Sequence, residues 1–155
     1  MDELPEGAET NVLFDVWLIA RATGELLHPA VSPTGLDADE FGVYSALAAN
    51  DGTTPTELAR WLFTAPTTVS SVVRRLEARG HLERRRNPAD GRSYVLSLTP
   101  EGRAVHQAAG ARFLGVLDRV NAALGPDEPR VRDALGRLRV ALDEAAATGP
   151  DEPEA

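Results

Sequence analysis

The sequence predicts a mainly α-helical fold with one small β-hairpin. Hydrophobic residues recur at helical spacing over most of the 155 residues, which is typical of amphipathic helices. Only between residues 81 and 99 do they alternate roughly every second position, as they do in strands. A chain of this length is long enough to bury a core as one domain.

The composition excludes several classes of protein. The chain has no cysteine, so it can form no disulfide, cysteine nucleophile or cysteine-ligated zinc site. No apolar run approaches the roughly 18–20 residues that a membrane span needs. The acidic start lacks the regions of a signal peptide, so we expect a cytoplasmic protein without a membrane partner. The ends, residues 1–9 and 148–155, are acidic and rich in Gly and Pro, which predicts a flexible N-terminus and a disordered tail.

Positive charge is concentrated on one stretch of an acidic chain. The net charge is -8. Between Arg60 and Arg92, eight arginines stand against three acidic residues, so this stretch is net +5 and the remainder is -13. Such a distribution favours a nucleic-acid-binding face on an acidic body. A solvated helix face with incidental arginines is the alternative that charge alone leaves open.

Two helices are predicted in the first third of the chain. Hydrophobic residues at helical spacing predict a first helix over residues 10–28, and the stretch 28–35, with two prolines and a glycine, breaks it. Asp37 caps the next helix, and Glu40 follows three residues later, as in a capping box. The apolar side of this second helix consists of Phe41, Tyr44, Leu47 and Ala48.

A capping box also marks the start of a short third helix. Thr54 is the capping residue, Pro55 takes the first helical position and Glu57 completes the box. A fourth helix follows over residues 66–79, and Gly80 ends it in a left-handed conformation. The inward side of the fourth helix consists of Val69, Val72, Val73 and Leu76.

The spacing then changes to that of a hairpin. Residues 81–86 and 92–99 are predicted as two strands, and the Asn-Pro-Ala-Asp-Gly between them is typical of a tight turn. Thr99 and Pro100 cap and start the next helix, which runs to about Leu124. The expected apolar anchors of the hairpin are Leu82, Tyr94 or Val95, Leu96 and Leu98.

A last helix follows a break at Gly-Pro-Asp-Glu-Pro. Its apolar residues recur at alternating steps of four and three, which is the spacing of a coiled-coil seam. They are Val131, Leu135, Leu138, Leu142 and Ala145. The long terminal helices have too little local core to cover them, so a second copy of the chain is the economical partner.

The order of elements predicts a winged helix-turn-helix with dimerisation helices. Two helices joined by a tight turn and followed by a hairpin form such a core. We place this core at residues 36–99, within a single domain that spans 10–147. Residues 10–30 and 100–147 are then the dimerisation helices.

The outer side of the fourth helix carries short hydroxyl side chains followed by arginines. Hydroxyls near a helix N-terminus allow close approach to phosphates or bases, and an arginine can make two hydrogen bonds to a guanine. These features suit a helix that enters the major groove of DNA, although an ordinary amphipathic helix is the alternative. The DNA-binding candidates here are Thr67, Thr68, Ser70, Ser71, Arg74 and Arg75.

The hairpin adds a second group of DNA-binding candidates. Arg92 stands near the tip of a thin ribbon, where an arginine can enter a narrow minor groove. Asp90 stands two residues earlier, and a carboxylate can hold a guanidinium in one orientation by a bidentate bond. An exposed ion pair worth about 0–1 kcal/mol is the alternative. Arg84 and Arg86 lie on the first strand, where at least one arginine should face phosphate.

Residues 56–102 resemble the DNA-binding core of the MarR family of bacterial transcription regulators. The matching pieces are a Glu-Leu-Ala helix, a Thr-Val-Ser-x-x-Val recognition helix and the Leu-Glu-x-x-Gly at its end. The Asn-Pro-x-Asp-x-Arg wing and the closing Leu-Thr-Pro-Glu-Gly complete the set, in the family's order. The flanking helices match the family's architecture over nearly the whole chain.

The resemblance implies a homodimer with the first, fifth and sixth helices interleaved. Two recognition helices would then enter successive major grooves of a pseudo-palindromic operator, about 10 base pairs apart. The resemblance assigns Arg92 to the minor groove and Asp90 to bracing it. It also implies a repressor that a small molecule releases, often an aromatic acid or another lipophilic compound.

Two residues depart from the family pattern in the helix-turn-helix turn. The family usually has a glycine where Phe63 stands, and a phenylalanine disfavours a positive φ. A serine usually caps the recognition helix where Ala65 stands, and alanine offers no side-chain cap. Thr64 is the alternative cap.

A small-molecule pocket of the family type would lie between the DNA-binding part and the dimerisation helices. Aromatic residues on apolar helix faces supply its candidate walls, although such residues are more often simply part of a core. Arg21 or His28 could hold a carboxylate. The ligand-binding candidates are Trp17, Arg21, His28, Phe41, Tyr44 and Phe113.

Other kinds of site are not indicated. The three histidines stand far apart without clustered carboxylates, so we expect no metal and no cofactor. The sequence has no nucleophile elbow, no Gly-rich phosphate loop and no paired carboxylates, so we do not expect an enzyme. A winged helix that contacts only proteins, without a DNA ligand, is the alternative function.

Overall fold

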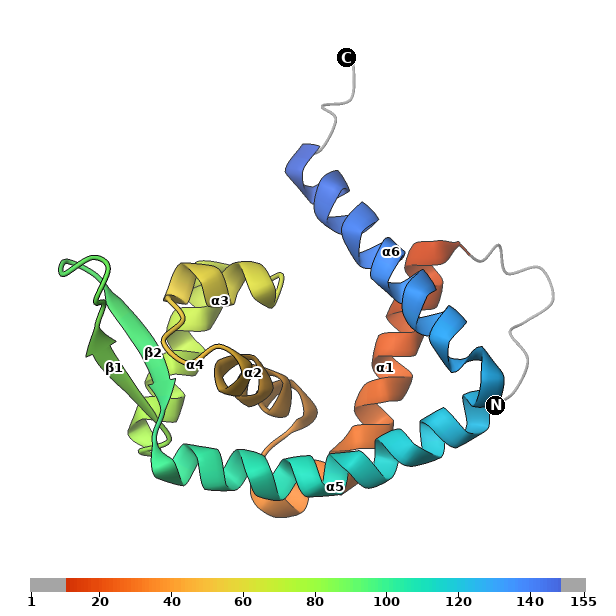
Figure 1. The fold of residues 1–155 in the computed structure, drawn as a ribbon, viewed down its shortest axis with the longest axis horizontal. Coiled ribbons are helices and arrows are strands. Elements are labelled where there is room, and N and C mark those ends of the chain that lie inside the picture. The colour runs from red at the N-terminus through yellow and green to blue at the C-terminus, as the bar shows by residue number, and fades with distance from the viewer. Residues whose placement is uncertain (1–10, 149–155) are drawn as a thin grey trace. The chain divides into compact units, whose positions relative to one another are not determined.

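The computed structural model describes residues 11–148, with helices and a hairpin in the predicted order (Figure 1). The predicted flexible ends, 1–9 and 148–155, lie outside the described residues except for Thr148, which ends the last helix. The chain divides after Val116, within the fifth helix, into two compact units. The elements are α1 (Val12–Val31), η1 (Ser32–Thr34), α2 (Ala38–Ala49), α3 (Pro55–Trp61), α4 (Pro66–Ala78), β1 (Leu82–Arg86), β2 (Tyr94–Leu98), α5 (Pro100–Leu124), η2 (Gly125–Asp127) and α6 (Glu128–Thr148).

Helix α1 differs from its prediction at both ends. It begins at Val12, because the Asn11 side chain accepts hydrogen bonds from the backbone N–H groups of the next turn. It continues through Pro29 to Val31, so the predicted break over residues 28–35 is wrong in its position. Pro29 lies in the last turn and gives up one backbone hydrogen bond there, and the buried side chain of Val31 anchors that turn.

The core of the first unit surrounds α2. Tyr44 and Leu47 are fully buried and share one apolar cluster with residues from α3, α4 and the hairpin. The prediction that Ala48 faces inward is wrong: Ala48 is exposed, whereas Val43 and Ala46 are buried. Other elements of the first unit pack against more than one face of α2, so its buried residues are not confined to one helix face.

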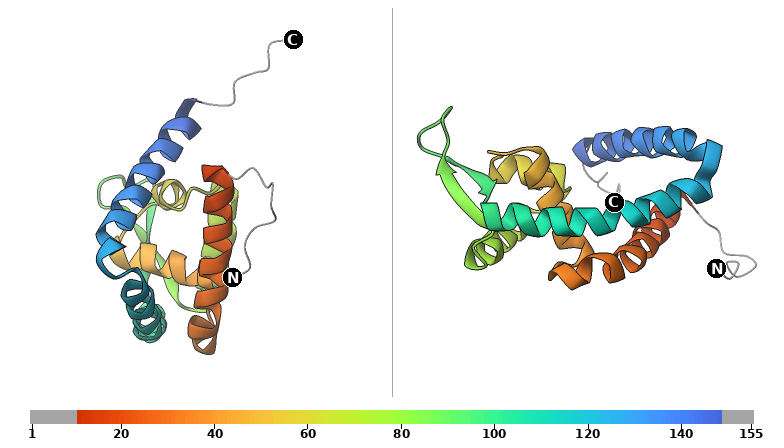
Figure 2. Two further views of the ribbon diagram at one scale, coloured as in Figure 1. Left: turned by 90° about the vertical axis from the view of Figure 1, so that its right-hand side faces the viewer. Right: turned by 60° about the horizontal axis from the view of Figure 1, so that its bottom comes forward.

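The hairpin packs against this core and projects its turn away from the helices of the first unit (Figures 1 and 2). Its strands pair antiparallel from Leu82 with Leu98 to Arg86 with Tyr94. The whole stretch from Val95 to Leu98 is buried, so the predicted alternation does not hold on β2. One side of β2 faces the core. The loop before α3 pairs with the edge of β2 that β1 leaves free, through backbone hydrogen bonds between residues 52–53 and Leu96.

The turn before α4 adopts a strained conformation. Phe63 has φ of +48°, in the left-handed region where the family usually has a glycine. Its side chain is 57% exposed, so little burial offsets this conformation. Ala65 is the N-cap of α4 and gives no side-chain hydrogen bond, and Thr64 does not replace it. Gly80 follows α4 with φ of +72°, as predicted.

Large apolar side chains remain exposed on the long helices of the single chain. They include Val12, Leu13, Trp17 and Ile19 on α1, Leu114, Leu117 and Val120 on α5, and Val131, Leu135 and Val140 on α6. Such exposure is typical of surfaces that a partner covers. No helix in the described part of the chain is long and apolar enough to cross a membrane.

Replacing Phe63 by glycine should stabilise the protein. Glycine adopts positive φ without strain, and we expect the free energy of unfolding to rise by about 0.5–1 kcal/mol after the greater entropy of glycine is subtracted. Urea unfolding measures the change. Phe63→Ala is the control, because it shortens the side chain but keeps a Cβ. Equal stabilisation by alanine would contradict the assignment to backbone strain.

Replacing Gly102 by alanine should destabilise the protein. A Cβ at this position, in the first turn of α5, would overlap the carbonyl oxygen of His81. We expect the free energy of unfolding to fall by roughly 1–3 kcal/mol, since backbone must move to make room. Gly42→Ala on α2 is the control, because a Cβ there meets open space. An unchanged unfolding curve for Gly102→Ala would show that the approach of α5 to the hairpin is not tight.

Candidate nucleic-acid interface

Helix α4 presents its polar face outward, as predicted. Val69, Val73 and Leu76 are buried against the core, which fixes the direction of the opposite face. The six polar candidates are all exposed: Thr67, Thr68, Ser70, Ser71, Arg74 and Arg75. The structure thus brings together every predicted DNA-binding residue of this helix on one accessible surface.

The two serines of this face bond to their own helix. The hydroxyl of Ser70 donates to the carbonyl oxygen of Pro66 at 2.9 Å, and that of Ser71 donates to Thr67 at 3.2 Å. Their oxygens keep lone pairs that can accept a further hydrogen bond. The Nε–H of Arg74 points back to the carbonyl of Ser70 at 3.4 Å, and no carboxylate of the described residues pairs with it.

A buried carboxylate from α2 reaches the same helix. Glu40 is 5% exposed, and its Oε1 lies 3.0 Å from Nε of Arg75 and 3.1 Å from Nη1 of Arg79. The side chain of Asp37 caps α2 at the backbone N–H of Glu40, as predicted. The second half of the expected capping box is wrong, however, because two guanidinium groups attract the Glu40 carboxylate more strongly than a backbone N–H does.

The three arginines of β1 have separate partners. Arg84 binds Glu77 of α4 through Nε and Nη2, at 2.7 and 2.9 Å, and its guanidinium lies 4.6 Å from the Tyr94 ring centre. The hydrogen bonds that Arg84 donates to the Glu77 carboxylate raise the pKa of Arg84 above its usual value. Arg86 lies against the turn, where a Cβ at Gly91 would meet its Nη2 at 2.6 Å.

Asp90 does not brace the side chain of Arg92. Its Oδ1 accepts a hydrogen bond from the backbone N–H of Arg92 at 3.1 Å, and its carbonyl oxygen accepts one from Ser93. Within residues 11–148, no ion pair joins the two side chains, so the predicted bidentate bond is wrong for the free chain. The carboxylate stabilises the turn instead, since an Asp side chain readily bonds the backbone two residues on.

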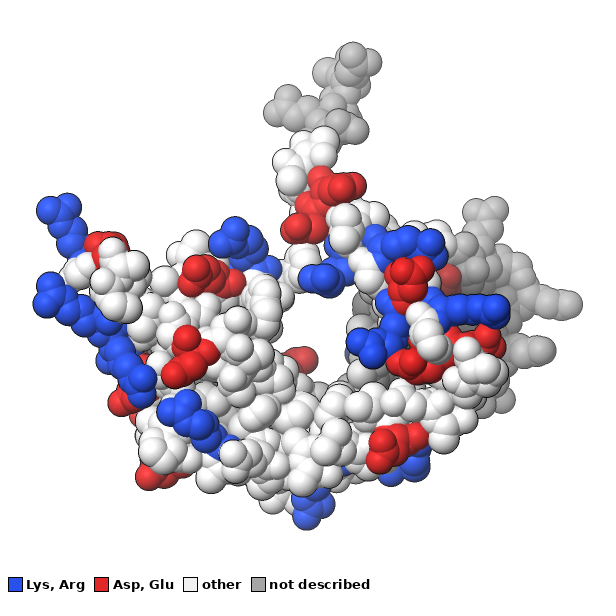
Figure 3. Space-filling model, viewed as in Figure 1, with Lys and Arg blue, Asp and Glu red and all other residues white. Residues whose placement is uncertain are grey.

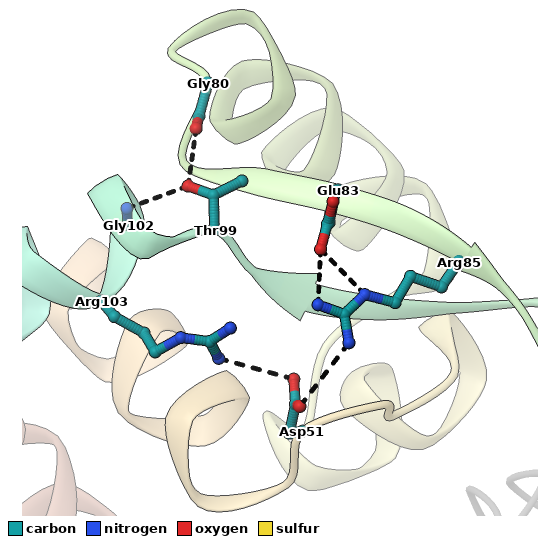
Figure 4. Close-up of polar contacts among 7 residues, drawn as sticks. All are labelled: Asp51, Gly80, Glu83, Arg85, Thr99, Gly102 and Arg103. Atoms are coloured by element: carbon teal, nitrogen blue, oxygen red, sulfur yellow. Dashed lines mark hydrogen bonds and ion pairs between the residues drawn. The ribbon is translucent and has the colours of Figure 1, made fainter.

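A chain of ion pairs connects the hairpin to α5 (Figure 4). Arg85 lies 2.6 Å from Glu83 and 4.0 Å from Asp51, and Asp51 lies 3.7 Å from Arg103. These side chains are about half exposed, so each pair contributes little stability, about 0–1 kcal/mol. Beside them, Thr99 donates to the carbonyl of Gly80 and accepts from the first turn of α5, which fixes the start of that helix.

These contacts divide the arginines of the basic stretch into two groups. Carboxylates form ion pairs with Arg75, Arg79, Arg84 and Arg85, the first two sharing Glu40. No ion pair within the described residues engages Arg60, Arg74, Arg86 or Arg92. Basic side chains gather along the outer edge of the hairpin (Figure 3). The sequence did not predict that Glu40 and Asp51 pair with arginines of this surface. Both lie outside the basic stretch, and only their negative charge indicates such a role.

Three of the ligand-binding candidates belong to the core of the first unit. Phe41 packs against Phe113, with ring centres 5.3 Å apart, and against His106 at 5.6 Å. Tyr44 is fully buried, and its hydroxyl lies 2.6 Å from Nδ1 of His81. Burial raises the pKa of Tyr44 above its usual value. These residues therefore fill the interior of the single chain.

The other three ligand-binding candidates lie exposed along α1. Trp17, Arg21 and His28 are accessible, and the guanidinium of Arg21 lies 5.6 Å from the centre of the Trp17 ring. The structure does not bring these three together with Phe41, Tyr44 and Phe113 around one hollow. A hollow of about 540 Å³ lies elsewhere, between the loop before α3 and Trp61. Within the described residues, no group of three or more His, Cys, Asp or Glu could hold a metal.

Comparison with known proteins identifies a family and several relatives. The family model described as MarR family matches residues 34–93. The HTH-type transcriptional repressor Rv2887 of Mycobacterium tuberculosis is 34% identical over 120 residues, which cover 74% of this chain and 86% of the relative. These relatives are transcriptional regulators, which confirms that the chain is not an enzyme.

Solved structures extend the similarity to nearly the whole chain. The transcriptional repressor CouR, bound to a 23-mer DNA duplex, superposes with a TM-score of 0.74 at 30% identity, over 91% of this chain and 99% of that one. The regulator PcaV of Streptomyces coelicolor, in complex with its natural ligand, has a TM-score of 0.71 at 30% identity, over 91% and 97% of the two chains. The predicted winged helix-turn-helix fold is thereby confirmed.

The stability of the first unit should depend on the ionisation of His106. Burial lowers the pKa of this imidazole, which stacks on Phe41 and lies 3.1 Å from the Ser45 hydroxyl. Below about pH 6.5, the ordinary pKa of histidine, the unfolded chain binds a proton that the folded chain takes up only at lower pH, so stability falls with acid.

We expect the melting temperature to fall more steeply between about pH 7.5 and 5.5 in the wild type than in His106→Gln, which cannot take up that proton. Thermal unfolding followed by circular dichroism, at one protein concentration, measures both slopes. Parallel slopes would show that burial of His106 contributes nothing to the acid sensitivity.

Proposed function

The chain belongs to the MarR family, and we propose that it is a transcriptional repressor that binds double-stranded DNA sequence-specifically. The observation that carries this proposal is that one compact unit presents two exposed surfaces suited to DNA. One is the hydroxyl- and arginine-bearing face of α4, and the other is a projecting hairpin whose tip carries Arg92. The similar repressors Rv2887 and CouR, and the DNA bound to CouR, support it.

In this proposal α4 is the recognition helix. Its N-terminal turn begins at Pro66 and carries the exposed hydroxyls of Thr67 and Thr68, which can approach phosphates or bases closely. Arg74 has no carboxylate partner among the described residues, so its charge is available to DNA. The opposite face is buried in the core, which leaves only this side free to enter a major groove.

The hairpin acts as the wing, with Arg92 reaching into the minor groove. Narrow minor grooves have a strongly negative potential that attracts arginine. Asp90 keeps the wing turn in shape through the backbone of Arg92, so the guanidinium remains available to DNA. Arg86 lies against the same turn and supports the positive charge of the tip. Arg84, paired with Glu77, adds less charge to this surface.

The repressor acts as a homodimer in the cytoplasm. The exposed apolar residues of α1, α5 and α6 supply the surface that a second copy covers. A two-fold axis then presents two α4 helices to half-sites about one helical turn, or 10 base pairs, apart. The 23-mer duplex bound by CouR is long enough for two such half-sites. Residues 36–99 form the DNA-binding core, and 10–30 with 100–147 form the dimerisation helices.

A small molecule releases the protein from its operator. The similar regulator PcaV was solved in complex with its natural ligand, which supports regulation by a bound ligand. Arg21 lies beside the Trp17 ring, and this exposed cationic and aromatic pair on α1 suits an aromatic or carboxylate compound. His28 is a further exposed polar group, nearer the end of the same helix. Phe41, Tyr44 and Phe113 occupy the core, so they take part only if that core rearranges.

Arg92→Ala should weaken specific DNA binding and its dependence on salt. We expect a loss of roughly 1–3 kcal/mol per protomer, the usual value of one arginine interaction with DNA. The slope of log affinity against log salt should become shallower by about 1 per protomer, because each arginine bound near phosphate releases about one counterion. The measurement is fluorescence anisotropy over a salt series with a duplex taken from upstream of the protein's own coding region.

The control is Arg130→Ala on α6, an arginine outside the proposed interface, which should leave affinity and slope unchanged. Equal effects of the two substitutions would contradict a wing that touches DNA. Binding that does not respond to salt would favour the alternative of a winged helix that contacts only proteins, since phosphate contacts release counterions.

A further inference from the structure

Helix α4 carries an arginine whose position is set by a carboxylate from the core. Glu40 stands in the first turn of α2, with 5% of its surface exposed. Its Oε1 lies 3.0 Å from Nε of Arg75, while its two oxygens lie 3.1 and 3.2 Å from Nη1 of Arg79. One buried carboxylate therefore joins α2 to two successive turns of α4.

The backbone of Glu40 is held in place by its neighbours. Asp37 accepts a hydrogen bond from the N–H of Glu40 at 2.6 Å, and Phe41, the next residue, is buried in the core. A carboxylate can stay charged in such a site only when cations and hydrogen bonds compensate it. Since one negative charge faces two guanidinium groups, the cluster keeps a net positive charge on the α4 side.

The two arginines differ in what they can still reach. Arg79 is the C-cap of α4, donates a hydrogen bond to Glu40 and has 37% of its side chain exposed. Arg75 stands one turn earlier and has 49% exposed. Residues four and seven positions apart share a helix face, so Arg75 lies in line with Ser71 and Thr68 of the proposed recognition surface.

We propose that Glu40 is a positioning residue that orients the Arg75 guanidinium to read a base edge in the major groove. This inference rests on the proposed function. A side chain held at Nε has lost much of its rotamer freedom before DNA arrives, so less ordering is needed on binding. A planar guanidinium in a fixed orientation suits the bidentate contact to guanine O6 and N7.

The arginines have two different roles in this proposal, attraction by charge and recognition of a base. Arg74 and Arg92 have no carboxylate partner within residues 11–148 and act mainly through charge, which favours any DNA sequence. Arg75 is partly neutralised by Glu40, which reduces its value for phosphate while fixing its geometry. Glu40 thus makes Arg75 contribute more to discrimination between DNA sequences than to general attraction for DNA.

The test compares discrimination between two duplexes. One duplex is selected from a random-sequence pool on the wild-type protein, and the other is its scrambled version of equal composition. Glu40→Gln and Arg75→Lys should each lower the ratio of the two affinities by about ten-fold or more, the value of one bidentate contact. The double variant should fall no further, because both changes remove the same interaction.

Two matched controls distinguish positioning from simple stabilisation. Arg79→Lys disturbs the same carboxylate, and Glu77→Gln removes the exposed partner of Arg84 on the same helix. Both should stay within about two-fold of the wild-type ratio. Arg75→Lys changes a half-exposed residue, so it keeps the test decisive if Glu40→Gln does not fold.

The outcomes separate this inference from the proposed function. Failure of the pool to yield an enriched sequence would overturn sequence-specific binding itself. Enrichment with full discrimination in Arg75→Lys would overturn only the role of Arg75 and Glu40. Equal losses in Arg79→Lys and Glu40→Gln would also overturn it, because the cluster would then act only by holding α4 against α2.

Discussion

The structure of the DNA-binding unit depends on one buried carboxylate and the two arginines that compensate it. Glu40 is placed by the core through α2, and Arg75 and Arg79 belong to α4 and its C-cap. Apolar packing of Val69, Val73 and Leu76 determines which face of α4 is buried. The ion pairs add a polar, directional connection, which specifies position more narrowly than non-directional apolar packing does. Apolar packing and these ion pairs together fix which face of α4 is exposed.

The distribution of carboxylates also explains how an acidic chain can carry a basic surface. Acidic residues pair with the arginines nearest the core and the base of the hairpin. Arg74, Arg86 and Arg92 are exposed and form no ion pair within residues 11–148. We expect the remaining acidic surface to repel DNA elsewhere and so to reduce non-specific coating. Most of the unpaired arginines of the basic stretch therefore lie on α4 and the hairpin, the two elements that we propose contact DNA.

Local patterns in the sequence predicted the elements, but not the partners of the charged side chains. The capping box at Thr54 and the left-handed Gly80 were predictable, because each depends on residues within one turn. The ion pairs of Glu40 were not predictable. Glu40 and Arg75 stand 35 positions apart, and no spacing in the sequence connects them. Phe63 shows another limit: tertiary packing of α3 and α4 imposes a positive φ that a phenylalanine disfavours.

The proposed function requires α4 and the hairpin to form one DNA-binding surface. A crystal structure of the full chain bound to the duplex that it selects from a random pool would show whether they do. We expect α4 in a major groove, with Arg75 at a base edge, and Arg92 in the adjacent minor groove. A complex in which the outer face of α4 remains exposed to solvent, with DNA bound elsewhere, would contradict it.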